Sequence, residues 1–455
     1  METILVKNAR RIVTMNNRDL ILENADLLIE GNKIFNIGFN VGERADRILD
    51  AAGKIVLPGF INTHHHLFQT LFRAVPDIQN KSLFPWLIHL YQMWRQLTPE
   101  AVYVGAMVGI GELLLTGCTT TTDHFYVYPK GLPGNLLDET IKAARELGIR
   151  FYPTRGSISL GQSQGGLPPD DLTQTEEEIL QDSRRVIENY HDSSAFSMCR
   201  IGLSPNAPFS ATASLMKNTV RLAREAKVMC HTHLAETKDE EVYCLEKFNR
   251  RPLQYLEDLE WIGEDIWFAH GIHFNDEELE KLARSKTKIA HCPSSNSRLG
   301  SGVAPYPKWK EKKVIFGLGV DGSASNDSSN MWGEVRQFLL AHRGAWGSEI
   351  MTPYEALKCA TRNGAELLDW REIGSLEPGK AADLILIDTR KIAYAGASYD
   401  PVAALVLCGD NFIVDTSVVN GKIVVEKGKL TQASEEKIVE AADHIISTLW
   451  MSGVQ

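Results

Sequence analysis

The sequence has little cysteine and no apolar run long enough to cross a bilayer. Its seven cysteines are scattered, and no two of them form a Cys-x-x-Cys pair. This spacing is typical of reduced thiols and not of a disulfide framework. The N-terminus also lacks the apolar core of a signal peptide. Together these absences predict a soluble, cytoplasmic protein.

Basic charge is scarce as well. The chain has 48 Lys and Arg against 58 Asp and Glu, which gives a formal net charge of -10 at pH 7. A nucleic-acid partner requires a basic surface, so the composition argues against one. Hydrophobic residues at 44% and charged residues at 23% are ordinary values for a globular protein. A chain of 455 residues suits one large α/β barrel with an accessory domain.

Both ends of the chain have the pattern of short strands and turns. Near the N-terminus, apolar segments are separated by turns such as residues 30–33, and near the other end two strands flank Asn420-Gly421. We therefore expect a small composite β-sandwich domain built from residues 1–57 and 375–430. A C-terminal helix is expected over residues 431–455.

Residues 58–374 alternate short apolar segments with longer amphipathic ones, and this alternation predicts a catalytic (β/α)8 barrel. A long insert follows the first strand and extends to Trp94, where it can shape a pocket. The expected strands are 61–63, 119–124, 150–155, 199–204, 228–233, 266–270, 288–291 and 314–321. The expected helices are 101–115, 136–147, 175–190, 213–225, 239–247, 276–283 and 331–341.

Histidines stand at the ends of several predicted strands. Alternate side chains of a strand point the same way, so His64 and His66 project to one side and His65 to the other. A lone buried histidine is usually a hydrogen-bonded core residue. Active sites of such barrels, however, lie at the C-terminal strand ends, and imidazole is the commonest ligand of zinc and similar ions. Further histidines and one aspartate end the later strands: His233, His270, His291 and Asp321.

This arrangement resembles the amidohydrolase superfamily in its mononuclear, deaminase-like branch, and the resemblance extends to the run at residues 377–383. It implies Glu236 as the acid/base, His270 as a contact of the attacking water or substrate, and Asp321 as a second catalytic carboxylate. Strand four has no lysine to bridge a second metal. Zinc is expected, although iron and manganese suit the same ligands. The ligands that the resemblance implies for one divalent metal are His64, His66, His233 and Asp321.

Such a ligand set leaves an open position for water, whose pKa falls to about 7. We expect Asp321 to take a proton from this water while Glu236 protonates a ring nitrogen of a heterocycle. Ammonia then leaves, and a carbonyl replaces the amine.

Local runs at residues 64–76, 154–170, 233–237, 291–296 and 321–327 resemble the 8-oxoguanine deaminases, whose relatives are often labelled hydroxytriazine aminohydrolases. The resemblance implies conversion of 8-oxoguanine to uric acid and ammonia in purine catabolism, by a homodimer. Alternatives are an s-triazine amino- or chlorohydrolase, and a deaminase of isocytosine, another aminopyrimidine or guanine. A non-catalytic barrel is disfavoured because every matched ligand position is present. Asn206 stands where the 8-oxoguanine group leads us to expect cysteine, so ring preference can differ.

Several polar residues are candidates for substrate binding. Gln69 can read a ring edge with its paired donor and acceptor groups, and Arg73 and Trp86 can hydrogen-bond to and stack on a flat ring. A rim or packing role is the alternative for these two. Further candidates, also with structural alternatives, are Asn206 and Asn296. His231 is expected to be a hydrogen-bonded interior residue, His65 a packing residue, His124 and His291 lining or support, and Cys292 a buried thiol.

Overall fold

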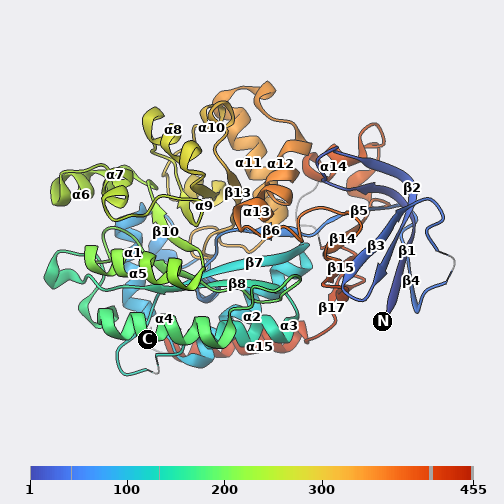
Figure 1. The fold of residues 1–455 in the computed structure, drawn as a ribbon. Helices are drawn as coiled ribbons and strands as arrows, with labels where there is room; N and C mark the ends of the chain where they lie inside the picture. Colours follow the sequence, from blue (N-terminus) through green and yellow to red (C-terminus); the bar gives the residue numbers. More distant parts are fainter. Residues whose placement is uncertain (1, 43, 133, 409–412, 452–455) are drawn as a thin grey trace.

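Eight parallel strands form the barrel of the computed structural model, which describes residues 2–42, 44–132, 134–408 and 413–451 (Figure 1). Neighbours in the sheet follow the order of the chain, and the Thr63 amide donates to the Leu318 carbonyl at 3.0 Å, which joins the first strand to the last. The expected barrel is therefore confirmed. Its strands are β6 (Phe60–Asn62), β7 (Cys118–Phe125), β8 (Arg150–Ser157), β9 (Gly202–Pro205), β10 (Cys230–Leu234), β11 (Ile266–His270), β12 (Lys288–His291) and β13 (Phe316–Leu318).

Two barrel strands are shorter than the sequence pattern predicts. β9 begins at Gly202, because Cys199 forms only an isolated bridge to Phe151. β13 ends at Leu318, and the chain then turns away from the sheet at Asp321, whose φ of 64° lies in the left-handed region. Such a backbone angle is incompatible with strand pairing.

Helices surround the barrel, and sequence-encoded caps fix several of their ends. In α4 the Thr175 hydroxyl accepts from the Glu178 amide while the Glu178 carboxylate accepts from Thr175, a capping box. The helices between barrel strands are α2 (Pro99–Leu115), α3 (Leu137–Leu147), α4 (Glu176–Tyr190), α5 (Ala213–Ala226), α6 (Lys238–Phe248), α7 (Pro252–Asp258), α8 (Asp276–Ser285), α9 (Pro293–Arg298) and α10 (Tyr306–Lys312). After the last strand come α11 (Met331–Trp346), α12 (Pro353–Cys359), α13 (Arg362–Leu367) and α14 (Pro401–Leu407).

The long insert after β6 is itself helical. It consists of the short 3₁₀ segments η1 (Leu67–Phe72) and η2 (Pro76–Ile78), followed by α1 (Leu83–Trp94). Other short helical segments are η3 (Gln162–Gln164), η4 (Asp170–Leu172), η5 (Ser348–Ile350), η6 (Ile392–Tyr394) and the π-helical η7 (Ser447–Met451). No helix within the described ranges is long and apolar enough to span a membrane.

Both ends of the chain build one nine-stranded mixed sheet beside the barrel, as expected (Figure 1). β14 pairs antiparallel with β5 near its centre, and β15 and β16 are joined through Asn420 and Gly421, both at positive φ. The strands are β1 (Thr3–Val13), β2 (Ile21–Glu30), β3 (Lys33–Gly38), β4 (Arg47–Asp50), β5 (Lys54–Pro58), β14 (Leu384–Asp388), β15 (Thr416–Val419), β16 (Lys422–Glu426) and β17 (Lys429–Leu430).

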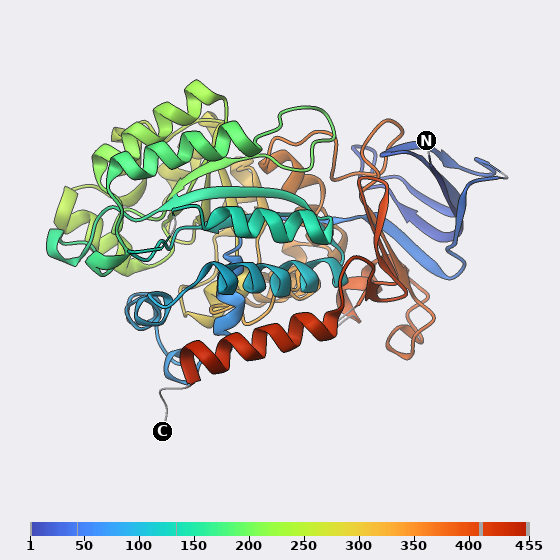
Figure 2. The same cartoon turned by 90° about the horizontal axis from the view of Figure 1, so that it is seen from below.

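The C-terminal helix α15 (Glu435–Ile446) leaves this sheet and lies along α2 on the outside of the barrel (Figure 2). The Trp450 indole then donates to the Met93 carbonyl at 3.0 Å, and its ring lies 4.6 Å from that of Phe72. The division into domains at residues 57, 374 and 430 stays a prediction.

A buried ion pair joins the barrel to the terminal sheet. Arg150 at the start of β8 donates to both carboxylate oxygens of Asp383, at 2.8 and 3.1 Å, and also to the side chain of Asn420. The side chains of the pair are 0% and 3% exposed. Because the guanidinium has no access to water, Asp383 supplies the counter-charge that offsets its burial.

We predict that Asp383→Ala lowers the free energy of unfolding by about 3–5 kcal/mol, because it leaves a buried cation without its counter-ion. Urea unfolding followed by circular dichroism measures the change. The matched control is Asp388→Ala, since Asp388 pairs with Arg390, whose side chain is 59% exposed. That variant is expected to lose less than about 1 kcal/mol. Equal unfolding midpoints for the two variants would contradict the prediction.

Candidate functional site

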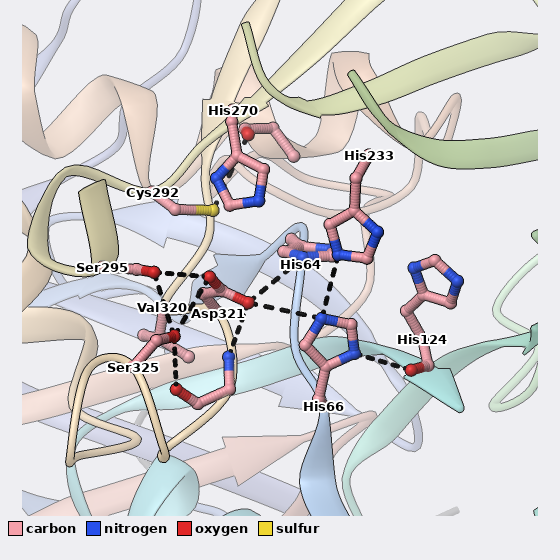
Figure 3. A network of polar contacts seen from close by, with 12 residues as sticks. His64, His66, His124, His233, His270, Cys292, Ser295, Val320, Asp321 and Ser325 are labelled. Carbon is pink, nitrogen blue, oxygen red and sulfur yellow. Dashed lines mark hydrogen bonds and ion pairs between the residues drawn. The ribbon is translucent and has the colours of Figure 1, made fainter. Parts of the chain in front are cut away.

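The strand-end histidines and Asp321 converge at the C-terminal mouth of the barrel (Figure 3). His64 and His66 follow β6, and His233 lies in β10. His270 ends β11 and has a φ of 74°, while Asp321 follows β13 at 64°. These left-handed backbone angles are strained for residues other than glycine. They turn the two side chains toward the histidines of the neighbouring strands.

A relay of hydrogen bonds fixes which nitrogen of His64 carries its proton. His231 Nδ1 lies 2.9 Å from the Trp267 carbonyl oxygen, which can only accept, so Nδ1 bears the hydrogen. In the neutral ring, His231 Nε2 is then an acceptor, and His64 Nδ1 donates to it at 2.8 Å. The lone pair of His64 is therefore on Nε2, which has no hydrogen-bond partner among the described residues. His231 has the interior role expected for it.

His66 and His233 are fixed in the same way by backbone carbonyls. His66 Nδ1 donates to the His124 carbonyl at 2.7 Å, and His233 Nδ1 donates to the Asn206 carbonyl at 2.7 Å. Burial, with the neighbouring His64, lowers the pKa of His66 to about 3, so its ring is neutral. Burial likewise holds the pKa of His233 well below its usual range. Both rings therefore present a lone pair on Nε2.

These lone pairs face one another without a proton between them. The Nε2 atoms of His66 and His233 are 3.1 Å apart, and Asp321 Oδ1 lies 3.3 Å from Nε2 of both His64 and His66. Acceptors so close in a buried site repel unless a cation lies among them. The donor set of imidazole nitrogens and a carboxylate suits a divalent transition metal. The residues therefore fit a metal ion.

His270 differs from the other histidines in the proton it presents. Its Nδ1 lies 3.1 Å from the amide nitrogen of Asn296, which donates to it, so the ring hydrogen is on Nε2. This Nε2–H lies 3.4 Å from the Glu236 carboxyl. His270 therefore offers a hydrogen-bond donor at the site. One of its ring nitrogens also lies within 4.8 Å of ligand atoms of His64, His233 and Asp321.

Asp321 is held by groups that stabilise its ionised form. Its Oδ2 accepts from the hydroxyls of Ser295 at 2.6 Å and Ser325 at 3.2 Å, and its Oδ1 accepts from the Gly322 amide at 2.7 Å (Figure 3). Hydrogen bonds to a carboxylate favour the charged state. The sequence pattern pointed to Asp321 but not to the two serines that orient it.

Glu236 is a buried carboxyl, 4% exposed, beside His270. Burial raises its pKa well above the usual range, and the nearby charges of Asp321 and Glu240 raise it further. The carboxyl is therefore able to hold a proton at neutral pH. Ala235, just before it, has a φ of 55°, and the Glu240 carboxylate accepts from the Glu236 amide at 3.0 Å, which fixes this turn.

A small cavity opens onto these groups. Three of the candidate substrate-binding residues line it, namely Gln69, Trp86 and Asn206. The sequence reasoning missed Tyr126, although it lies two residues beyond His124 and so on the same side of the chain. The other lining residues beyond the histidines, Glu236 and Asp321 are Leu83, Leu87, Phe209, Leu299 and Ser325.

The other two candidates are not among the residues that line this cavity. The Arg73 guanidinium pairs with the Glu112 carboxylate of α2 and also contacts the Ser329 hydroxyl, to which His65 is hydrogen-bonded. Asn296 lies behind His270 and donates to it. Both residues therefore lie outside the lining of the cavity, and their part in substrate binding stays a prediction.

Two larger hollows lie away from the histidines. The first is lined by α3, β8 and the β15–β16 hairpin, the second by residues at the N-terminal ends of the later barrel strands. Neither contains any of the residues that form the histidine and aspartate site. Active sites of such barrels lie at the C-terminal face, where the smaller cavity opens.

A (β/α)8 barrel with imidazole lone pairs and a carboxylate at its C-terminal mouth defines the class of barrel hydrolases with a metal site. The sequence model of the amidohydrolase family matches residues 55–424. The 8-oxoguanine deaminase of Pseudomonas aeruginosa is 44% identical over 411 residues, 90% of each chain. The hydroxydechloroatrazine ethylaminohydrolase of a Pseudomonas species is 33% identical over 460 residues, 98% of this chain and 95% of the other.

Among solved structures, atrazine chlorohydrolase from Arthrobacter aurescens, complexed with zinc, superposes with a TM-score of 0.94. It is 32% identical and covers 97% of this chain and 100% of its own. The chain therefore belongs to the amidohydrolase family, and it is a hydrolytic enzyme of the deaminase branch.

We predict that His231→Phe weakens zinc binding about 10–100-fold, because His64 loses the acceptor that keeps its lone pair on Nε2. Competition with a chromophoric chelator measures the dissociation constant. The matched control is His291→Phe, another buried strand-end histidine, neither of whose ring nitrogens has a partner in the described part of the chain. Its zinc affinity is expected to stay within about threefold of the wild type, since it orients no ligand. Equal affinities for the two variants would refute the relay.

Proposed function

We propose that this enzyme hydrolyses an amino-substituted heterocycle to the oxo compound and ammonia, with 8-oxoguanine as the first candidate substrate and uric acid as its product. The observation that carries the proposal is the pairing of Glu236, a buried carboxyl able to hold a proton, with the Nε2–H of His270. An acid and a hydrogen-bond donor beside a group of metal-binding lone pairs suit addition of water to a ring C=N bond.

In this proposal His64, His66, His233 and Asp321 hold one divalent ion. When bound, the ion acts as a Lewis acid and lowers the pKa of water to about 7. Zinc is the ion we propose, because imidazole ligands suit it and because the solved atrazine chlorohydrolase is complexed with zinc. Iron and manganese suit the same ligands.

The residues of the chain then move the protons. Asp321 takes a proton from the attacking water as its oxygen bonds to the ring carbon that bears the amine. Glu236 gives its proton to the adjacent ring nitrogen, which neutralises the charge that forms there. His270 donates a hydrogen bond that steadies the attacking oxygen. Asp321 returns its proton to the amino group, the carbon–nitrogen bond breaks, ammonia leaves and Glu236 regains a proton as the carbonyl forms.

The walls of the cavity suit a flat heterocycle. Its apolar side is formed by Leu83, Trp86, Leu87, Phe209 and Leu299, and its polar side by Gln69, Tyr126 and Asn206. The amide oxygen of Gln69 is buried without a partner among the described residues, so a ring N–H can satisfy it. The relative at 44% identity supports 8-oxoguanine over other rings.

An s-triazine is the second candidate substrate, because a hydroxydechloroatrazine ethylaminohydrolase and an atrazine chlorohydrolase match nearly the full chain. Their identities of 33% and 32% are lower than that of the 8-oxoguanine deaminase. A homodimer, a cytoplasmic location and a role in purine catabolism stay predictions.

We predict ammonia release from 8-oxoguanine by purified enzyme that contains one zinc ion per chain. The screen also contains guanine, isocytosine, cytosine, hydroxytriazines and chlorinated or N-alkyl triazines. A coupled glutamate dehydrogenase assay measures ammonia, and chloride and alkylamine are measured in parallel. Turnover of triazines alone, with no ammonia from any aminopurine or aminopyrimidine, would reject the proposal in favour of the second candidate.

We predict that Glu236→Gln lowers kcat for the accepted substrate by about 10²–10⁴-fold while the bound metal is retained, because the amide cannot donate the proton that the carboxyl supplies. Steady-state kinetics and elemental analysis on the same sample check both statements. Glu246→Gln is the control, since Glu246 is an exposed carboxylate on the nearby helix α6. Loss of metal together with activity in Glu236→Gln would instead assign Glu236 to metal binding.

A further inference from the structure

His124 is a buried histidine that the proposed mechanism does not use. It lies in β7, is fully buried and is not among the residues that line the cavity. Its Nε2 is 2.9 Å from the Ser204 carbonyl oxygen, which can only accept, so Nε2 bears the hydrogen. The lone pair of the neutral ring is therefore on Nδ1, and this atom has no hydrogen-bond partner within the described ranges.

This ring belongs to the same cluster as the metal-binding histidines. One ring nitrogen from each of His64, His66, His124 and His233 lies within 4.8 Å of the others. The His124 ring is 4.8 Å from that of His233 and 5.3 Å from that of His66, on the side away from Asp321 (Figure 3).

The cluster therefore offers more acceptor nitrogens than the first metal site, which includes the Asp321 carboxylate, requires. His64, His66 and His233 each donate through Nδ1 and present Nε2, while His124 donates through Nε2 and presents Nδ1. Leaving a buried acceptor unpaired is unfavourable for each group. A cation bound among them removes this cost for all of them at once.

We propose that His124 is a fourth imidazole ligand, so that the chain has a second, all-histidine position for a metal ion. This position shares His64, His66 and His233 with the first and uses His124 in place of Asp321. The ion that suits this position is a transition-metal cation that prefers imidazole, such as Zn²⁺, Ni²⁺ or Cu²⁺, and not an ion that prefers oxygen ligands, such as Mg²⁺. An ion held there leaves the Asp321 carboxylate free, so the enzyme retains its metal even when that carboxylate is unavailable.

The test is a double-mutant cycle with Asp321→Ala and His124→Gln. The glutamine amide can still donate to the Ser204 carbonyl, but it has no ring lone pair. Each single variant keeps one complete set of four ligands, so each is expected to bind Zn²⁺ within about tenfold of the wild type. The double variant is expected to bind about 100-fold more weakly than Asp321→Ala. Chelator competition gives the dissociation constants, and elemental analysis gives the zinc content.

The matched control is His342→Gln in the same Asp321→Ala background. His342 is also a buried histidine with an unpartnered Nε2 in the described structure, but it packs against His291 and Phe338, away from the cluster. It is expected to leave the zinc affinity of Asp321→Ala unchanged. Equal zinc affinities for Asp321→Ala with and without His124→Gln would overturn the proposal.

A spectroscopic measurement keeps the test independent of how well the double variant folds. Cu²⁺ bound to Asp321→Ala is expected to show superhyperfine coupling to four nitrogens by electron paramagnetic resonance. A three-nitrogen pattern in that single variant would overturn the proposal by itself. Where the double variant folds, the loss of one nitrogen from the pattern identifies His124 as its source.

Discussion

The site depends on backbone carbonyls that dictate where each imidazole carries its hydrogen. A carbonyl oxygen can only accept, so the carbonyls of His124 and Asn206 force the protons of His66 and His233 onto Nδ1. The Trp267 carbonyl does the same for His64 through His231. Each of these three rings therefore presents a lone pair on Nε2 before any ion binds. A peptide carbonyl cannot become a donor, so the proton of each ring stays on Nδ1.

Another histidine of the site has a different kind of partner. His270 is held by the amide nitrogen of Asn296 instead of a carbonyl, and this donor gives it the opposite tautomer. Two chemically identical side chains on neighbouring strands, His233 and His270, thus present different groups to the site because of one hydrogen-bond partner each. The two partners come from different segments at the mouth of the barrel, since Asn206 directly follows β9 and Asn296 lies in α9. Their placement leaves a lone pair on one ring and an N–H on the other.

The sequence predicted the barrel, the terminal β-structure and the group of strand-end residues, because strand alternation and strand order follow from local patterns. It did not predict tautomers, since the acceptors of His64 and His66 come from other strands. The ends of β9 and β13 were also missed, because pairing is decided by neighbours and not by apolar content. The sequence also did not predict the ion pair of Arg73 with Glu112 of α2, because the two residues are 39 positions apart and no short motif links them.

The shared terminal sheet has a consequence for how the chain is made. The inner strand β5 ends at Pro58, and its partner β14 begins only at Leu384. A ribosome adds roughly 5–20 residues per second, so the edge of β5 waits on the order of tens of seconds for its neighbour. Throughout that interval the nascent chain carries an open, apolar strand edge of the kind that aggregates. The sheet can be completed only late in synthesis, after the chain of the whole barrel has left the ribosome.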